Sequence, residues 1–166
     1  TFINKKNSII IYILYMKTQK MSKLPKHYTA KLSRKDKKKQ EKAISKSKRS
    51  YEKRKYYTRP KMKSFKNKKS SWTEKFHKLY PEAKSLKEIE KVTGIPKKAL
   101  MEVKKKGMGA YYSSGSRPNQ TAESWGKARM YAYIFGSPTR KVDKHITQKY
   151  KVKFKHKPKY QSYTLE

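Results

Sequence analysis

A large excess of positive charge is the feature that most limits how this chain can fold. The 166 residues include 47 Lys and Arg against 11 Asp and Glu, which gives a net charge of +36, and only 34% of the residues are hydrophobic. Such a charge opposes compaction unless an anionic partner neutralises it, and so few apolar residues cannot bury the whole chain. We therefore expect a small folded domain with long basic arms, and a polyanionic partner.

The charge is unevenly distributed, which predicts where the domain lies. Residues 22–70 form a Lys/Tyr-rich basic arm with a net charge of +18, and residues 144–166 form a second basic arm with a net charge of +6. Residues 71–143 carry a net charge of only +8 and have apolar residues at helical spacing. We expect the folded domain there, mainly α in class, with arms that are extended or disordered.

The first segment, residues 1–21, is an apolar leader that contains the run Ile9–Met16. A run of this length is too short to cross a bilayer, which takes roughly 20 residues. A membrane or partner anchor, a buried strand, and translation upstream of a true start at Met21 or Met16 all fit the leader. We favour the last interpretation.

The basic arm has tyrosines interleaved with its lysines. Ser33 is suited to cap a helix from Arg34, with Asp36 in the first turn, but that helix would be polar on all sides and marginal alone. Lysines neutralise phosphates and tyrosine rings stack on bases, so we expect the arm to bind a polyanion. The alternative is a solvated tail for solubility or nuclear import. The candidate contacts are Lys37, Lys38, Lys39, Arg54, Tyr56, Tyr57 and Arg59.

Residues 71–107 predict three short helices. Ser85 and Glu88 have the spacing of a capping box at the start of the second helix, and Gly94 suits the left-handed residue at its end. Pro96 suits the first turn of the third helix, which we expect to end at Gly107. The three apolar stripes are Trp72, Phe76 and Leu79 with Tyr80; Leu86, Ile89 and Val92; and Ala99, Leu100 and Val103.

The stretch from Ser85 to Leu100 resembles the helix-turn-helix of DNA-binding proteins, in which the second helix lies in the major groove. This third helix lacks Arg, Asn and Gln, so we expect weak sequence specificity. A helical hairpin that only packs inside the domain fits the same pattern equally well. On the helix-turn-helix interpretation, the residues near DNA are Lys97, Lys98, Met101, Lys104 and Lys105.

A Gly- and Ser-rich stretch, residues 107–121, leads into a Trp-containing helix that Thr121 is suited to cap. Backbone N–H groups at such a position favour an anion. Alternatively the loop is structural, with Arg117 paired to Glu123 or Asp143. The helix is expected at residues 122–135, with a buried stripe of Trp125, Ala128, Ala132 and Phe135. The anion-binding candidates here are Tyr111, Tyr112, Arg117, Lys127 and Arg129.

Residues 22–145 resemble a small Lys-rich family of unknown function from giant nucleocytoplasmic large DNA viruses. The resemblance is carried by Gly115–Thr121, Trp125, Ala128-Arg129, Tyr56–Arg59 and Lys63-Ser64-Phe65. It implies a viral origin and a location in the virion, a viral factory or a nucleus-like compartment of an infected cell, not secretion. It supplies no catalytic residues.

No catalytic or metal-binding pattern is visible, because the chain has no Cys and its four His are scattered. We expect no enzyme and no cofactor. The leading hypothesis is mostly sequence-nonspecific nucleic-acid binding, DNA before RNA, in condensation or packaging. The alternatives are a minor capsid or core protein whose arms thread between larger subunits, and a protein that binds anionic membranes.

In the C-terminal arm, basic and apolar residues alternate along Lys149–Lys157, so an exposed or edge strand is expected there.

Overall fold

The computed structural model describes residues 24–159, and the expectations for the leader lie outside these residues. The described part is mainly helical, as the apolar spacing predicts, and contains no strand. Its elements are a 3-10 helix η1 (Lys26–Tyr28), α2 (Arg34–Glu52), α3 (Ser71–Leu79), α4 (Leu86–Thr93), α5 (Lys97–Ser113), α6 (Ala122–Ile134), α7 (Thr139–Val142) and α8 (Lys144–Lys149).

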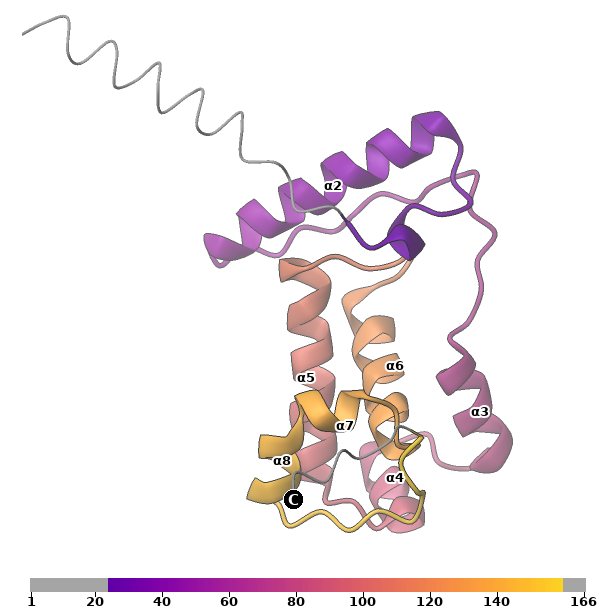
Figure 1. The fold of residues 1–166 in the computed structure, drawn as a ribbon, viewed down its shortest axis with the longest axis vertical. Coiled ribbons are helices and arrows are strands. Elements are labelled where there is room, and N and C mark those ends of the chain that lie inside the picture. Colours follow the sequence, from indigo (N-terminus) through magenta and orange to yellow (C-terminus); the bar gives the residue numbers. More distant parts are fainter. Residues whose placement is uncertain (1–23, 160–166) are drawn as a thin grey trace, which may run out of the picture.

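Helices α5 and α6 run side by side through the centre of the molecule (Figure 1). Helix α2 crosses one end of this pair, where the loop between α5 and α6 lies, and contacts α5. Helices α3, α4, α7 and α8 gather around the other end. The pair α5 and α6 therefore connects a basic helix at one end to a small helical bundle at the other.

Two glycines allow α5 and α6 to approach closely. A Cβ atom at Gly126 would lie 2.6 Å from the carbonyl oxygen of Lys104, and one at Gly107 would lie 2.8 Å from the Cα of Gly126. The prediction that the third helix ends at Gly107 is wrong, because the helix continues to Ser113. The glycine is needed for helix contact there, and a helix interior tolerates glycine at about 1 kcal/mol.

The main core lies between α3, α4, α5, α6 and α8. Phe76 is fully buried and its ring stacks on Tyr131, with 4.3 Å between ring centroids. The predicted stripe of α3 is wrong at Leu79, which is 50% exposed, whereas Tyr80, which the prediction places beside it, packs against the core. The fully buried core side chains include Ile89, Ile95, Leu100, Met130, Tyr133, Ile134, Phe135 and Ile146.

The predicted caps at Ser85, Gly94 and Thr121 are confirmed, whereas Pro96 is the N-cap of α5 and not a residue of its first turn. Ser85 and Glu88 form the capping box of α4, and Gly94 ends that helix in the left-handed conformation, with φ of 73°. Thr121 caps α6 in a reciprocal arrangement with Ser124. The helical hairpin of α4 and α5 is thus present.

The segment after α8, residues 150–159, is not the predicted strand. It is held over the bundle by Arg140, whose guanidinium donates hydrogen bonds to the carbonyl oxygens of Tyr133, Ile134 and His156. The Lys159 N–H also donates to the carbonyl oxygen of Gly136, at 2.7 Å. These contacts take backbone groups that a strand would otherwise offer to a partner.

The close contact of α5 and α6 predicts the effect of a single methyl group. Gly126→Ala places that methyl against the Lys104 carbonyl oxygen, and overpacking of this kind destabilises by about 1–3 kcal/mol. The matched control is Gly109→Ala, whose Cβ meets only the far end of the Tyr51 side chain, at 3.3 Å. Urea unfolding compares the two variants with the parent protein. A parent-like midpoint for Gly126→Ala would contradict the tight contact.

The C-terminal segment should respond to pH through His156. Burial, followed by the charges of Lys75, Arg140 and Lys155, holds the pKa of His156 below its usual value of 6.5. The folded state prefers the neutral ring, which lies 3.0 Å from the hydroxyl of Tyr80. The stabilisation is therefore fully present above about pH 6.5 and is lost as the pH falls through the folded-state pKa.

Thermal unfolding above and below this pH tests the expectation. We expect the loss of Tm on acidification to be smaller in His156→Gln than in the parent. The control is His77→Gln, because the side chain of His77 is exposed. An unchanged pH response in His156→Gln would refute the role of this ring.

Candidate nucleic-acid interface

Helix α2 has a buried face made mostly of small and polar side chains. The Gln40 side-chain amide donates to the carbonyl oxygen of Ser116 at 3.2 Å, and the Ser47 hydroxyl donates to that of Tyr112 at 3.1 Å. Ile44 is 1% exposed on the same face. The predicted cap at Ser33 is confirmed. We expected a helix polar on all sides in an unstructured arm, and the structure differs because hydrogen bonds to the end of α5 and to the α5–α6 loop hold the helix in place.

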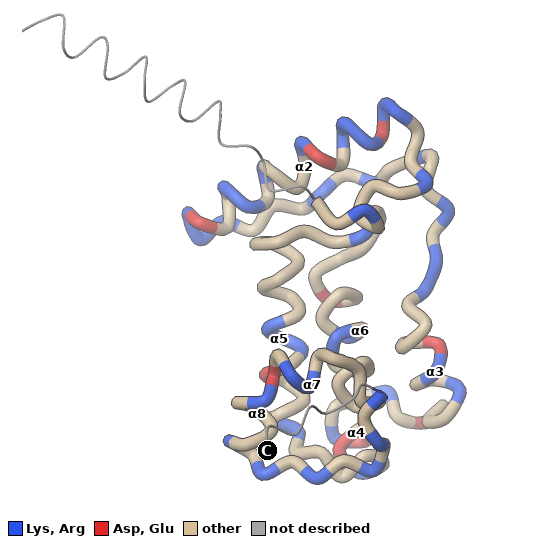
Figure 2. Tube along the Cα trace, viewed as in Figure 1, with Lys and Arg blue, Asp and Glu red and all other residues tan. Residues whose placement is uncertain are grey.

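The opposite side of α2 is strongly basic (Figure 2). None of its basic residues forms an ion pair within residues 24–159. Their charges are therefore left for an external anion. We call this surface the α2 basic face, and its exposed residues are Arg34, Lys35, Lys37, Lys38, Lys39, Lys42, Lys46 and Arg49. Lys37, Lys38 and Lys39 were predicted from the sequence.

The basic residues around α5 and α6 behave differently, because acidic groups pair with several of them. Asp143 is fully buried and accepts hydrogen bonds from Arg129, at 2.8 and 3.0 Å, and lies 3.0 Å from Lys106. Burial opposes ionisation of this carboxyl group, but these two partners outweigh it and lower the pKa of Asp143. Glu123 likewise binds Lys104 and Lys127.

These ion pairs affect the contacts that the sequence predicts. Lys104, Lys127 and Arg129 form ion pairs with acidic residues of the protein, whereas Lys98 and Lys105 are exposed on α5 and form none within residues 24–159. Lys97 is half-buried at the start of α5, where its N–H donates to Glu90.

Arg59 and Tyr111 are wrong as candidate phosphate and base contacts, because both are buried. The Arg59 guanidinium donates to the Tyr111 carbonyl oxygen at 2.8 Å and to the Ser116 hydroxyl at 2.6 Å. It also lies 3.6 Å from the centroid of the Tyr111 ring. This arginine joins residues 53–70, which follow α2, to the C-terminal end of α5.

The prediction of an anion-binding loop is also wrong for the first part of the stretch, because residues 107–113 belong to α5. The remaining residues of the stretch contact α2 and the segment that follows it, residues 53–70. Gly115, with φ of 99°, leaves room for Ile44, because a Cβ there would lie 3.0 Å from the Ile44 side chain. The Asn119 side chain bonds both the N–H and the carbonyl oxygen of Met62.

A cluster of tyrosines lies where α2 ends. The rings of Tyr51 and Tyr112 are stacked at 5.8 Å, and Tyr56 meets Tyr112 edge-on at 5.0 Å. Tyr56 is 73% exposed, which leaves its ring open to a ligand. Tyr57 is half-buried under the amine of Lys46, and Arg54 is exposed nearby in the chain. We call Tyr51, Tyr56 and Tyr112 the tyrosine cluster.

Sequence reasoning placed Tyr56 and Tyr112 in the site but missed Tyr51 and the outer residues of α2. The residues that α2 buries recur at helical spacing, but most of them are small or polar. A search for apolar residues at helical spacing therefore misses this buried face. The missed residues of the α2 basic face are Arg34, Lys35, Lys42, Lys46 and Arg49.

A comparison with protein families places the chain in one of them. The profile of a family of unknown function, DUF5824, matches residues 25–152. The chain belongs to DUF5824. No curated protein and no solved structure matches it. The DUF5824 match begins before η1 and ends at Val152, so the family unit includes α2, the α5–α6 loop that contacts it, and the helical bundle.

None of the helices in residues 24–159 has the length and apolar character needed to cross a membrane. Within the same residues, no group of three or more His, Asp and Glu side chains is arranged to hold a metal ion.

The structural role of Arg59 can be tested by Arg59→Lys. Lysine keeps the charge but lacks the forked donors, so the Tyr111 carbonyl or the Ser116 hydroxyl loses its partner. We expect a loss of about 1–3 kcal/mol of stability, the cost of one unsatisfied buried polar group. Arg54→Lys, at an exposed position close by, is the control. Equal denaturation midpoints for the two variants would show that the buried hydrogen bonds contribute little.

Proposed function

We propose that this DUF5824 protein binds nucleic acid, DNA before RNA, through the α2 basic face, without chemistry and with little sequence preference. Condensation or packaging of DNA is the expected role. The observation that carries the proposal is the α2 basic face itself, a row of exposed cations that form no ion pair within residues 24–159, on a helix whose other face is held by hydrogen bonds.

The length of α2 suits this role. Its 19 residues rise about 1.5 Å each, which gives a helix of roughly 28 Å. Double-stranded DNA carries one charge per about 1.7 Å of its axis, so a helix of this length faces several phosphates at once. Lysine acts as a point charge and supplies affinity without reading bases, which favours binding to any sequence.

The tyrosine cluster adds a second type of contact at the end of the same helix. Tyr56 is exposed, and Tyr51 and Tyr112 support it from the protein side. An open tyrosine ring beside exposed cations such as Arg54 is suited to pack on a sugar or an unpaired base.

Helix α5 is less suited to be the main contact. It is in contact with α2, α4, α6 and α8, and Glu90 binds the N–H of Lys97 at its start. Lys98, Met101 and Lys105 form its exposed strip. Insertion of this helix into a major groove stays a prediction, and in our proposal the α4–α5 hairpin serves mainly to pack the bundle.

The viral setting of the proposal rests on the resemblance carried by residues 115–121 and 125. A highly basic DNA-binding protein is what a virion or viral factory requires to condense a genome, because condensation needs neutralisation of phosphate charge.

Neutralising part of the α2 basic face should weaken binding to duplex DNA. Gln replaces Lys38, Lys42 and Arg49 with little change in helix propensity. We expect lower affinity at every salt concentration, and a log–log salt slope that is smaller by about 2–3, near 0.9 for each phosphate that the variant no longer neutralises. Fluorescence anisotropy of a labelled duplex, titrated at several salt concentrations, measures both quantities.

A control variant separates local contact from net charge. Gln at Lys78, Lys87 and Lys91 removes the same charge from exposed positions on α3 and α4. We expect this variant to lose much less affinity and to keep most of the slope. Absence of binding by the parent protein, a flat salt dependence, or equal losses in both variants would overturn the proposal.

A further inference from the structure

A second basic surface is a groove that extends from α6 to the segment just before α2. Two adjoining cavities of about 290 and 680 Å³ share Lys68, Arg117 and Gln120 as lining residues. No acidic residue lines either cavity. We call the two cavities together the α6 groove, and its basic lining residues are Lys31, Lys66, Lys68, Arg117 and Arg129.

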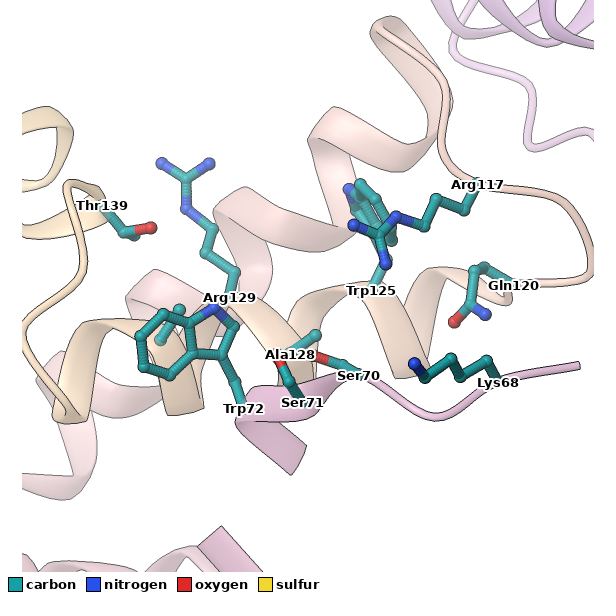
Figure 3. A pocket seen from close by; sticks show the side chains of 11 residues that line it. Lys68, Ser70, Ser71, Trp72, Arg117, Gln120, Trp125, Ala128, Arg129 and Thr139 are labelled. Atoms are coloured by element: carbon teal, nitrogen blue, oxygen red, sulfur yellow. The ribbon is translucent and has the colours of Figure 1, made fainter. Parts of the chain in front are cut away.

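Two tryptophans form part of the wall of the smaller cavity. Trp125 meets Tyr28 edge-on, with ring centroids 6.0 Å apart, and Trp72 stacks on the buried Phe135 at 6.4 Å. Each indole is thus held in place by an aromatic neighbour. Figure 3 shows Lys68, Gln120 and Arg117 near Trp125 at one end of the cavity, and Trp72 and Thr139 at the other.

The cations where the two cavities meet have free charge. Lys68 and Arg117 are exposed, and neither forms a hydrogen bond or ion pair through its side chain within residues 24–159. Arg129 differs, because Asp143 holds its guanidinium. Gln120 accepts a hydrogen bond from Ser124 through its carbonyl oxygen, which leaves its amide N–H groups as donors.

This combination matches one class of ligand. Free cations and amide donors bind phosphate, and a rigid indole offers a face for a flat ring. The size of the cavities lies in the range of about 300–1,000 Å³ usual for small-ligand sites. Paired bases in a duplex have their faces covered by their neighbours, so only an unpaired base reaches such a wall.

We propose that the α6 groove binds an unpaired nucleotide of single-stranded nucleic acid, with its phosphate on Lys68 and Arg117 and its base against Trp125. The inference rests on the proposed function for the kind of ligand, but it uses a different surface and a different form of nucleic acid. A free nucleotide has the same chemistry, so the test includes both sources.

Tryptophan fluorescence reports on this groove alone, because the chain has two tryptophans and both line the smaller cavity. The full chain is titrated with a single-stranded oligothymidylate, with a thymidine mononucleotide, and with a duplex. We expect quenching by the single strand at the lowest concentration, and little quenching by the duplex. Saturable quenching by the mononucleotide at concentrations comparable to the single strand would assign the groove to free nucleotides and overturn the strand-binding proposal.

The variant Lys68→Gln/Arg117→Gln tests the phosphate contacts with little risk to folding, since both side chains are exposed. We expect at least a tenfold loss of single-strand affinity and less than a twofold change for the duplex at the same salt concentration. The three-Gln variant of α2 should show the opposite pattern. Equal effects of the groove variant on both ligands, or none on the single strand, would overturn the groove proposal.

The two proposals fail separately in this design. If the parent protein binds no nucleic acid of any form, the proposed function fails and the groove proposal fails with it. If the duplex depends on the α2 basic face and the single strand does not depend on Lys68 and Arg117, the groove proposal alone fails.

Discussion

The close contact between α5 and α6 is the constraint on which the rest of the structure depends. Gly107 and Gly126 let the two backbones meet, so the end of α5 and the start of α6 are fixed beside each other. The loop between them is short and carries Gly115, Ser116 and Asn119, which bind α2 and the segment after it. A shift of one helix along the other would move these groups away from their partners, and α2 would lose its attachment.

The placement of acidic and basic side chains explains how so basic a chain can fold. Acidic side chains are placed where cations would otherwise meet in the interior, as at Asp143, or where they fix the fold, as Asp36 does by accepting hydrogen bonds from Ser64. Exposed cations, including those of α2 and of residues 61–69, lie where solvent and salt screen their repulsion. The chain thus folds without neutralising most of its charge, and that unneutralised charge is the basis of the polyanion binding that we propose.

The sequence was sufficient to predict α3, α4, α6 and the start of α5, because these helices follow ordinary signals, but it did not predict α7 and α8. The apolar spacing of α4 and the capping pairs at Ser85 and Thr121 each act within one helix turn. The sequence was not sufficient for α2, whose buried Gln40 and Ser47 find their partners more than 60 residues away.

The glycine at position 107 was misleading for the same reason. Both a turn and a close contact between helices require a residue without a side chain, and only the position of the partner helix distinguishes the two. Arg59 and Tyr111 were assigned to a ligand because their chemistry suits phosphate and bases, and the same chemistry suits each other.

One loop connects the two surfaces to which function is assigned. In residues 115–119, the side chains of Ser116 and Asn119 face the protein and hold residues 53–70 in place, whereas Arg117 is exposed and lines the α6 groove. The segment that this loop holds carries Lys68 to the other side of that groove. The contacts that fix α2 with its basic face outward are therefore the contacts that build the groove. A variant that loosens the loop, such as one at Asn119, should weaken both kinds of binding together, whereas exposed variants at Arg117 or Lys42 should weaken one alone.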